Sequence, residues 1–300
     1  MGMQGRSFAR QIRAYVSLTK PRVVELLLLT TVPTMILAQR GVPNPLSVLS
    51  VLLGGAMSAG AAGAFNCYID RDIDSKMSRT RNRPLVTGAL SPKASLIFAW
   101  MLCVISVLWF LLFVNWLSAL LSAIAVFLYA FFYSIVLKKR TPQNIVWGGL
   151  AGCMPVLIAW AAVTGSIDWP AIVLFAVVFL WTPPHYWPLS IHYSEDYRLT
   201  SIPMLGAIFP RKLVVLQVLL YAFAVVACTL LLIPVAHMTP LYGLFSAVLG
   251  AWFVYEIYRL YVRVVRGHEI KAMHIFSLSN TYLSLVFLSV GIDGVVSQLL

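Results

Sequence analysis

Long apolar runs, separated by short polar connections, dominate the chain from residue 23 onward. A helix that crosses the hydrocarbon core of a bilayer needs about 20 predominantly apolar residues. The runs that reach about this length cover residues 23–39, 45–65, 94–114, 117–137, 144–164, 169–189, 213–235, 240–261 and 275–299. Segments 26–29 and 111–114 are continuously apolar, whereas a transmembrane β-strand alternates polar and apolar residues. The pattern predicts an all-α, polytopic membrane bundle of about nine transmembrane helices.

The composition excludes a soluble protein. Hydrophobic residues make up 60% of the 300 residues, charged residues only 11%, and the mean hydropathy is +0.87. A soluble domain carries about 25% charged residues. We expect one membrane domain over residues 23–300, preceded by a cytoplasmic segment over residues 1–22.

The net charge is +12, and the positions of the basic residues indicate which class of protein this charge belongs to. They form short clusters between the apolar runs, which does not suit the continuous basic stripe of a nucleic-acid-binding protein. Alternate connections hold 21 of the 22 Lys and Arg residues, which leaves Arg40 alone on the other side. By the positive-inside rule, we expect a cytoplasmic N-terminus and an outer C-terminus. The two longest connections, residues 66–93 and 191–212, then lie on the cytoplasmic side, where we expect the chemistry.

An acidic cluster ends the second apolar run. Asn66, Asp70 and Asp74 are spaced by four, so each lies only about 40° around a helix from the last. They would form one polar ridge, with Asp72 on the opposite side beside Arg71. Because Mg²⁺ prefers carboxylate and amide oxygens, the ridge predicts a cation site made by Asp70, Asp74 and Asn66. The alternative is a solvated helix end whose acids pair with nearby basic residues.

Basic side chains beside this ridge are candidates for binding phosphate, because guanidinium groups grip phosphate oxygens in pairs. Arg79 and Arg83 share a face if their segment is helical up to Pro84. The candidate ligands of a diphosphate are Arg71, Arg79, Arg83 and Lys138. The alternative for the arginines is a general attraction to anionic lipids.

A second polar group follows the sixth apolar run. The Pro183–Pro184 pair is expected to break the backbone hydrogen bonding of that helix beside a cavity, and His185 follows directly. Glu195 and Asp196 offer a second acidic site, or simply a solvated loop. His185 is either functional or an ordinary buried histidine.

Tyr129 and Tyr133 lie four residues apart near the third cytoplasmic connection, where they either line a chamber or belong to an interfacial aromatic belt.

Three glycines of the fifth apolar run, Gly148, Gly149 and Gly152, permit close helix packing.

These motifs together resemble the membrane-embedded, UbiA-type prenyltransferases. The resemblance rests first on the run from Asn66 to Asp74 followed by Arg79-Thr80 and Arg83-Pro84-Leu85. It is extended by 18–23, 138–146, Pro183-Pro184-His185, Asp196-Tyr197 and Ile202-Pro203-Met204. It implies a nine-helix prenyltransferase domain that uses Mg²⁺ to join an isoprenoid diphosphate to an aromatic acceptor. At two places in the second loop where relatives often carry basic residues, this chain has Tyr193 and Glu195.

More narrowly, the stretches resemble the branch of this family that farnesylates haem. That resemblance implies that farnesyl diphosphate, haem B and water give haem O and diphosphate. It also implies a catalytic set of Asn66, Asp70, Asp74 and His185, with Mg²⁺ as cofactor and haem B as substrate. The expected setting is a bacterial plasma membrane with the active site toward the cytoplasm. The expected partners are the lipid bilayer and a downstream haem A synthase or terminal oxidase assembly, with no nucleic acid.

Three other functions stay open at this point. A related prenyltransferase with a quinone-precursor acceptor would carry similar acidic motifs. A transporter or channel could use Asp70 and Asp74 to bind a coupling ion, although transporters usually show internal repeats and a site near the membrane midplane. A haem-handling assembly factor could use His185 without catalysis.

Overall fold

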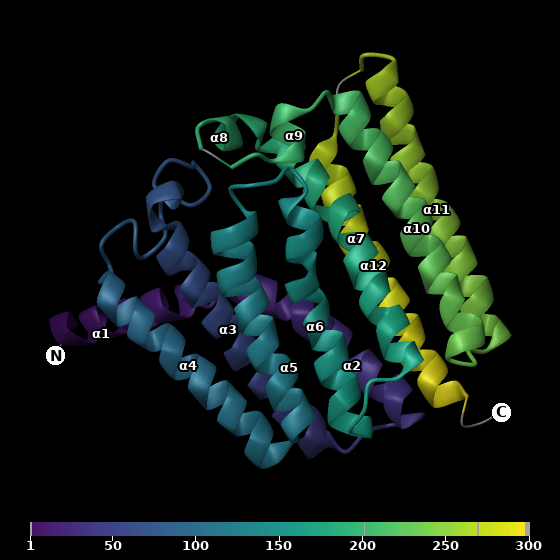
Figure 1. The fold of residues 1–300 in the computed structure, drawn as a ribbon, viewed down its shortest axis with the longest axis horizontal. Helices are drawn as coiled ribbons and strands as arrows, with labels where there is room; N and C mark the ends of the chain where they lie inside the picture. Colours follow the sequence, from purple (N-terminus) through teal and green to yellow (C-terminus); the bar gives the residue numbers. More distant parts are fainter. Residues whose placement is uncertain (1, 201, 269, 298–300) are drawn as a thin grey trace.

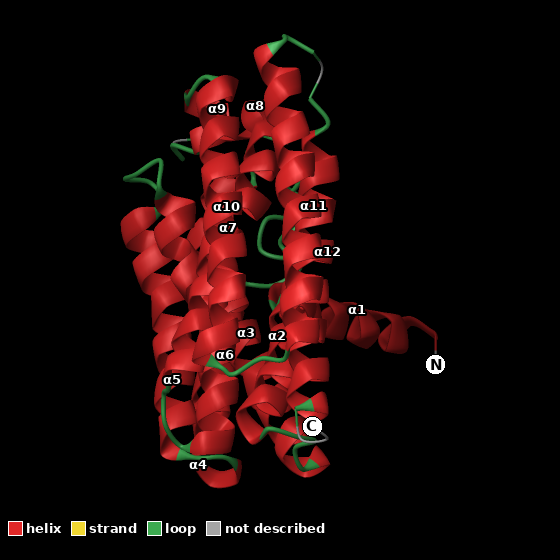
Figure 2. Cartoon of the chain, turned by 90° about the vertical axis from the view of Figure 1, so that its right-hand side faces the viewer, coloured by secondary structure: helices red, strands yellow, loops and turns green. Residues whose placement is uncertain are grey.

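Long helices that follow the apolar runs build the molecule (Figures 1 and 2). The computed structural model describes residues 2–200, 202–268 and 270–297, and for residues 2–7 and 22–28 it describes the backbone alone. The elements are α1 (Gly2–Leu18), α2 (Pro21–Gln39), α3 (Pro45–Asp74), α4 (Pro92–Phe113), α5 (Trp116–Phe127), the π-helix η1 (Leu128–Leu137), α6 (Asn144–Thr164), α7 (Trp169–His192), α8 (Ser194–Arg198), α9 (Leu205–Ile208), α10 (Arg211–Val235), α11 (Pro240–Val265) and α12 (Ala272–Val296).

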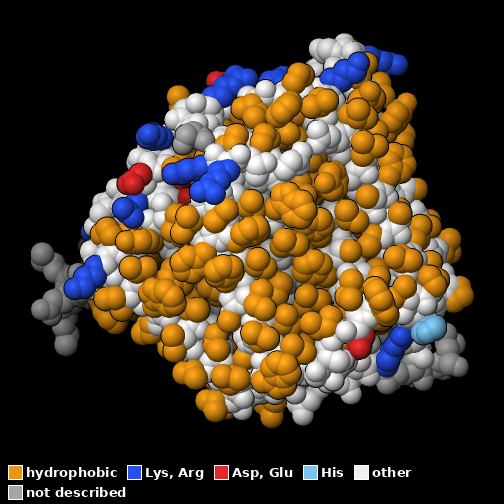
Figure 3. Space-filling model, in the orientation of Figure 1, with side chains coloured by type: hydrophobic (Ala, Val, Ile, Leu, Met, Phe, Trp, Pro, Cys, Tyr) orange, Lys and Arg blue, Asp and Glu red, His pale blue; other side chains and the backbone are white. Residues whose placement is uncertain are grey.

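The predicted membrane bundle is confirmed. Among the described residues, eight helices are long and apolar enough to cross a membrane, with α5 and η1 acting as one. The first predicted run falls on α2, of which the side chains of 22–28 lie outside the described part, as do residues 298 and 299 of the last run. Apolar side chains cover most of the face in Figure 3, and Lys and Arg gather along its upper edge. Such a surface is stable only in lipid.

Two helices differ from the sequence pattern. The helix of the second run continues nine residues past the predicted end at Phe65, so that the whole acidic cluster lies on α3. The helix of the sixth run, α7, continues three residues past the predicted end at Leu189, to His192, and contains Pro183, Pro184 and Pro188. Pro183 and Pro184 are buried where α7 packs between α6, α10 and α12, and tight packing stabilises a helix that has lost backbone hydrogen bonds.

The segment before the first span is also helical. α1 runs across the direction of the other helices and projects from the bundle (Figure 2). Ala14 and Leu18 are buried, whereas Phe8, Ile12 and Val16 are exposed along one face. A helix with an exposed apolar face is typical of one that lies in the membrane interface.

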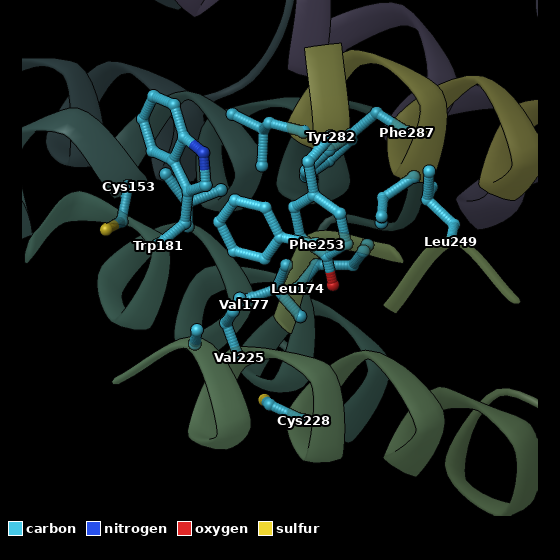
Figure 4. Close-up of a cluster of buried hydrophobic side chains, with 14 of the residues drawn as sticks. Cys153, Leu174, Val177, Trp181, Val225, Cys228, Leu249, Phe253, Tyr282 and Phe287 are labelled. Carbon is cyan, nitrogen blue, oxygen red and sulfur yellow. The ribbon is translucent and has the colours of Figure 1, made fainter. Parts of the chain in front are cut away.

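The largest buried cluster joins α7, α10, α11 and α12 (Figure 4). Its centre is the stacked pair Phe253 and Tyr282, whose ring centroids lie 4.2 Å apart. Trp181 of α7 donates through Nε1 to the carbonyl oxygen of Ser279 at 2.7 Å, which ties α7 to α12. This half of the bundle is therefore held together by one continuous apolar cluster.

A buried carboxylate stabilises the end of the bundle that lies away from α8 and α9. Asp293 of α12 is 4% exposed and accepts hydrogen bonds from the backbone N–H of Thr239, at 3.1 Å to Oδ1 and 3.3 Å to Oδ2. The Thr239 hydroxyl donates to Oδ1 as well. Thr239 is the N-cap of α11, so the negative charge also meets the positive end of that helix dipole. An apolar groove lined by Tyr242, Phe245 and Leu288 opens at this end.

We predict that Asp293→Ala lowers the free energy of unfolding by about 1–3 kcal/mol, because it leaves the N-terminal groups of α11 without their buried acceptor. The thermal unfolding midpoint in detergent measures this effect. Ser166→Ala, an exposed change at the same end, is the control. Equal midpoints for the two variants would contradict the assignment of a structural role to Asp293.

Candidate active site

The predicted polar ridge forms on the last turns of α3. Asn66, Asp70 and Asp74 are 3%, 2% and 3% exposed, whereas the side chain of Asp72 is 85% exposed on the opposite side of the helix. The Nδ2 group of Asn66 donates to Oδ2 of Asp70 at 2.8 Å and to the Ser134 hydroxyl at 2.9 Å. The spacing by four has thus placed an amide and two carboxylates on one buried face.

Lys20, which sequence reasoning did not select, contacts the first member of this ridge. Its Nζ donates to Oδ1 of Asn66 and lies 3.4 Å from the Tyr129 hydroxyl. An ammonium group has donors only and a carboxylate acceptors only, so Lys20 and Asp70 together fix which way the Asn66 amide faces. Burial lowers the pKa of Lys20, and the acidic groups nearby oppose that shift.

Both carboxylates are paired with basic residues outside α3, of which one is nine positions away in the sequence and the other 68. Lys138, directly after η1, donates to Oδ2 of Asp70, and Arg83 donates to Oδ2 of Asp74 at 2.5 Å. The Lys138 and Arg83 side chains are 14% and 25% exposed. Charges removed from water to this degree are stable only when paired. Two of the four basic candidates therefore belong to the ridge.

The other two basic candidates lie elsewhere. The segment after α3 is a series of turns rather than a helix, so Arg79 and Arg83 do not share a helical face. Arg79 is exposed, and its guanidinium lies 5.5 Å from the ring centroid of Tyr193. Arg71 donates to the carbonyl oxygen of Tyr68 at 3.0 Å and lies 3.8 Å from Asp72, which turns it away from the ridge.

The second acidic loop touches the first loop without joining its acidic cluster. The Ser78 hydroxyl donates to Oδ2 of Asp196 at 2.6 Å, while Glu195, 81% exposed, pairs with Arg198 at 2.6 Å. Within the described ranges, no three His, Cys, Asp or Glu side chains lie close enough together to hold a metal ion by themselves. Among the described residues, therefore, only Asp196 of the second acidic pair contacts the loop that follows α3.

The remaining acceptor atoms of the ridge suit a hard cation. In the described part of the chain, Oδ1 of Asp70 and Oδ1 of Asp74 have no hydrogen-bond partner, although both residues are buried. Carboxylate oxygens with spare acceptor capacity are the ligands that Mg²⁺ prefers. The donor set fits that ion, provided that anionic ligands arrive with it to offset the neighbouring Lys and Arg charges.

Aromatic side chains border the ridge on the side of the bundle. Tyr129 and Tyr133 of η1 stack with centroids 5.7 Å apart and are half-buried, so they lie inside the bundle rather than in an exposed belt. Tyr197 belongs to the buried cluster that also holds Met77, Ile145 and Ile202, and Tyr186 packs against this cluster. Tyr186 and Tyr197 were not among the sequence candidates. Their positions directly after His185 and Asp196 were the only available signals.

His185 is enclosed by aromatic rings instead of facing the ridge. It is 5% exposed and stacks between Trp181 and Phe276, with centroid distances of 4.2 and 4.3 Å. Its Nδ1 bonds to the Ser279 hydroxyl at 2.9 Å. Among the described residues, His185 has no hydrogen bond to Asn66, Asp70 or Asp74. These contacts fit a residue that orders the packing of α7 on α12.

Comparison with known proteins identifies the family. Residues 27–281 match the model of the UbiA prenyltransferase family. The chain is 59% identical over 285 residues to a protein named protoheme IX farnesyltransferase from Clavibacter michiganensis, covering 95% of this chain and 93% of the relative. A protein of the same name from Leifsonia xyli is 60% identical with the same coverage. The chain belongs to the UbiA prenyltransferase family. It is an integral membrane protein of prenyltransferase type, which removes the transporter from the open functions.

Solved structures agree with this UbiA fold. A UbiA homologue from Archaeoglobus fulgidus bound to DMAPP and Mg²⁺ matches with a TM-score of 0.69 at 16% identity, covering 93% of this chain and 99% of the homologue. A digeranylgeranylglyceryl phosphate synthase matches with a TM-score of 0.74 at 15% identity, covering 95% of this chain and 99% of that one.

A glycine of α6 makes room for the Tyr133 ring, which stacks on Tyr129. A Cβ atom on Gly148 would lie 2.3 Å from Cδ2 of Tyr133, whereas a Cβ on Gly152 would meet no atom within 4 Å. We predict that Gly148→Ala displaces the Tyr133 ring and lowers the rate of prenyl transfer by about tenfold, with a loss of about 1–3 kcal/mol in stability. Diphosphate release and thermal unfolding measure the two effects. Gly152→Ala is the matched control, and equal behaviour of both variants would show that Tyr133 tolerates displacement.

Proposed function

We propose that this protein transfers the farnesyl group of farnesyl diphosphate to a vinyl group of haem B. The observation that carries the proposal is the identity of 59–60% over 95% of the chain with proteins named protoheme IX farnesyltransferase. In the reaction, the bond from farnesyl to the diphosphate oxygen breaks, the farnesyl carbon bonds to the vinyl group, and water supplies a hydroxyl group. The products are haem O and diphosphate.

In this proposal the acidic residues of the ridge bind the cation, and their basic partners bind the diphosphate. Asp70 and Asp74 would hold Mg²⁺ through their unpaired Oδ1 atoms, with Asn66 beside them. The ion, when bound, neutralises the departing diphosphate. Arg83 and Lys138 would then turn from the carboxylates to the phosphate oxygens. Arg79 would bind the diphosphate from the exposed side of the site. Arg71, which faces Tyr68 and Asp72, contributes only to the general positive charge.

The tyrosines serve the other half of the substrate. When the carbon–oxygen bond breaks, the farnesyl group becomes an allylic cation, which the electron-rich faces of aromatic rings stabilise. Tyr129 and Tyr133 stack on each other, and the Tyr129 hydroxyl lies 3.4 Å from Nζ of Lys20, so both rings are candidates for this role. A bundle interior also excludes water until the farnesyl group has been transferred.

We further propose a setting for this activity. Residues 23–300 act as a single catalytic domain in the plasma membrane of a bacterium, and residues 1–22 lie at its cytoplasmic surface. The distribution of 21 of the 22 basic residues supports a site that opens to the cytoplasm. Haem O would pass to a haem A synthase or to terminal oxidase assembly.

Incubation of the purified protein with haem B, farnesyl diphosphate and Mg²⁺ tests the proposed reaction. We expect mass spectrometry to find a haem heavier by one farnesyl group and one hydroxyl group, since the second proton of the water leaves with the diphosphate, and we expect a chelator of divalent cations to abolish this product. Unchanged haem, with the farnesyl group attached to a phenolic quinone precursor instead, would move the protein to another branch of its family.

The roles of the two buried carboxylates can be separated from general charge effects. We predict that Asp70→Asn and Asp74→Asn each lower turnover by at least about a hundredfold, because each removes a charged oxygen from the cation site. Asp72→Asn is the matched control, since Asp72 lies between them in the sequence with its side chain 85% exposed. Product formation by quantitative mass spectrometry measures the effect. Full activity of both buried variants would eliminate the cation site.

A further inference from the structure

Lys20 reaches the active site from the junction between α1 and α2, outside every motif assigned above to the diphosphate. The backbone of Lys20 has φ +53°, a left-handed conformation that non-glycine residues adopt at a cost. Pro21 follows at the first position of α2. Strained backbone of this kind persists only where its surroundings hold it.

Two glycines of α3, Gly60 and Gly63, form the surface on which this junction packs. A Cβ atom on Gly63 would lie 3.1 Å from the carbonyl oxygen of Leu18 and 3.2 Å from that of Thr19, and one on Gly60 would lie 3.1 Å from the Thr19 side chain. The junction therefore packs directly on α3. Asn66 is three residues beyond Gly63, so it lies nearly one turn further along the same helix. This packing brings the Lys20 ammonium to Oδ1 of Asn66.

Lys20 carries a positive charge that is not paired with either carboxylate of the ridge. Lys138 offsets Asp70 and Arg83 offsets Asp74, whereas Lys20 contacts only the neutral Asn66 and Tyr129 groups. Lys20 therefore brings to the site a positive charge that no carboxylate of the ridge contacts in the described part of the chain. Together with Arg79 and a divalent cation, this charge can act on a prenyl diphosphate, which carries about −3 at neutral pH. Lys20 completes the neutralisation of the substrate rather than that of the protein.

We propose that Lys20 is a mobile cation of the diphosphate site. Without substrate, it holds Oδ1 of Asn66. With Mg²⁺ and a prenyl diphosphate bound, its ammonium would turn from that oxygen to the diphosphate, and this would free the Asn66 amide oxygen as a ligand beside Asp70 and Asp74. This inference rests on the proposed function in so far as the substrate is farnesyl diphosphate.

Binding of farnesyl S-thiolodiphosphate, a slowly reacting analogue, to the full-length protein tests the role of Lys20. We expect Lys20→Gln to weaken the calorimetric affinity for the analogue with Mg²⁺ by about tenfold or more, because it removes a charge-assisted contact. The glutamine amide can still donate to Asn66, so this variant is expected to fold. Lys20→Arg, which keeps the charge, should stay within about threefold of wild type. Lys93→Gln, an exposed change with the same loss of charge, should bind like wild type.

Titration with Mg²⁺ alone separates substrate binding from a structural role. We expect Lys20→Gln to bind Mg²⁺ without the analogue as well as wild type or better, because a competing cation has gone. Equal weakening of both affinities, or analogue binding equal to that of Lys93→Gln, would overturn the role of Lys20. Failure of the wild type to bind the analogue would overturn this role together with the proposed function. Analogue binding without any haem product would overturn the proposed function alone.

Discussion

The positions of the loops and side chains around the candidate site depend on two carboxylates that are buried at the end of a membrane helix. Removing an ionised carboxylate from water is costly unless an opposite charge or a hydrogen bond compensates it. Asp70 and Asp74 meet that condition through Lys138 and Arg83, which come from two different connections. The loop after α3, the π-helix η1 and the chain after it therefore converge on one point, and the cations that stabilise the carboxylates without substrate are also suited to binding phosphate.

Small residues allow this convergence. Gly60 and Gly63 let the α1–α2 junction lie against α3, and Gly148 makes room for the Tyr133 ring between η1 and α6. The π-helix contributes as well, since the N–H of Lys138 bonds to the carbonyl oxygen of Tyr133 five residues earlier at 2.9 Å. A π-turn changes the angular positions of the residues that follow it and is frequent at functional sites. Local backbone features therefore decide which side chains meet the buried acids.

The ridge itself could be predicted from the sequence because it depends only on helical periodicity. The exposure of Asp72 follows from the same periodicity. Its partners could not be predicted in this way, since Lys20 and Lys138 lie 46 and 68 positions from the residues they contact. Reasoning about Arg79 and Arg83 assumed a helix where the chain forms turns. The lost hydrogen bonds at Pro183 and Pro184 could be predicted from the sequence, whereas the packing of α7 against three helices, which stabilises it there, could not.

Comparison of the buried carboxylates at the two ends of the bundle separates a structural acid from a functional one. At Asp293, both oxygens accept from Thr239, and the helix dipole of α11 supplies further compensation. At Asp70 and Asp74, Oδ2 carries every contact that the described residues make, and Oδ1 is left over. Burial and residue type are the same in both places. The difference is that Oδ1 of Asp70 and Oδ1 of Asp74 accept no hydrogen bond from the described residues, while Lys138 and Arg83 lie beside them. Carboxylate oxygens with spare acceptor capacity beside cations are suited to a metal ion that binds together with an anion.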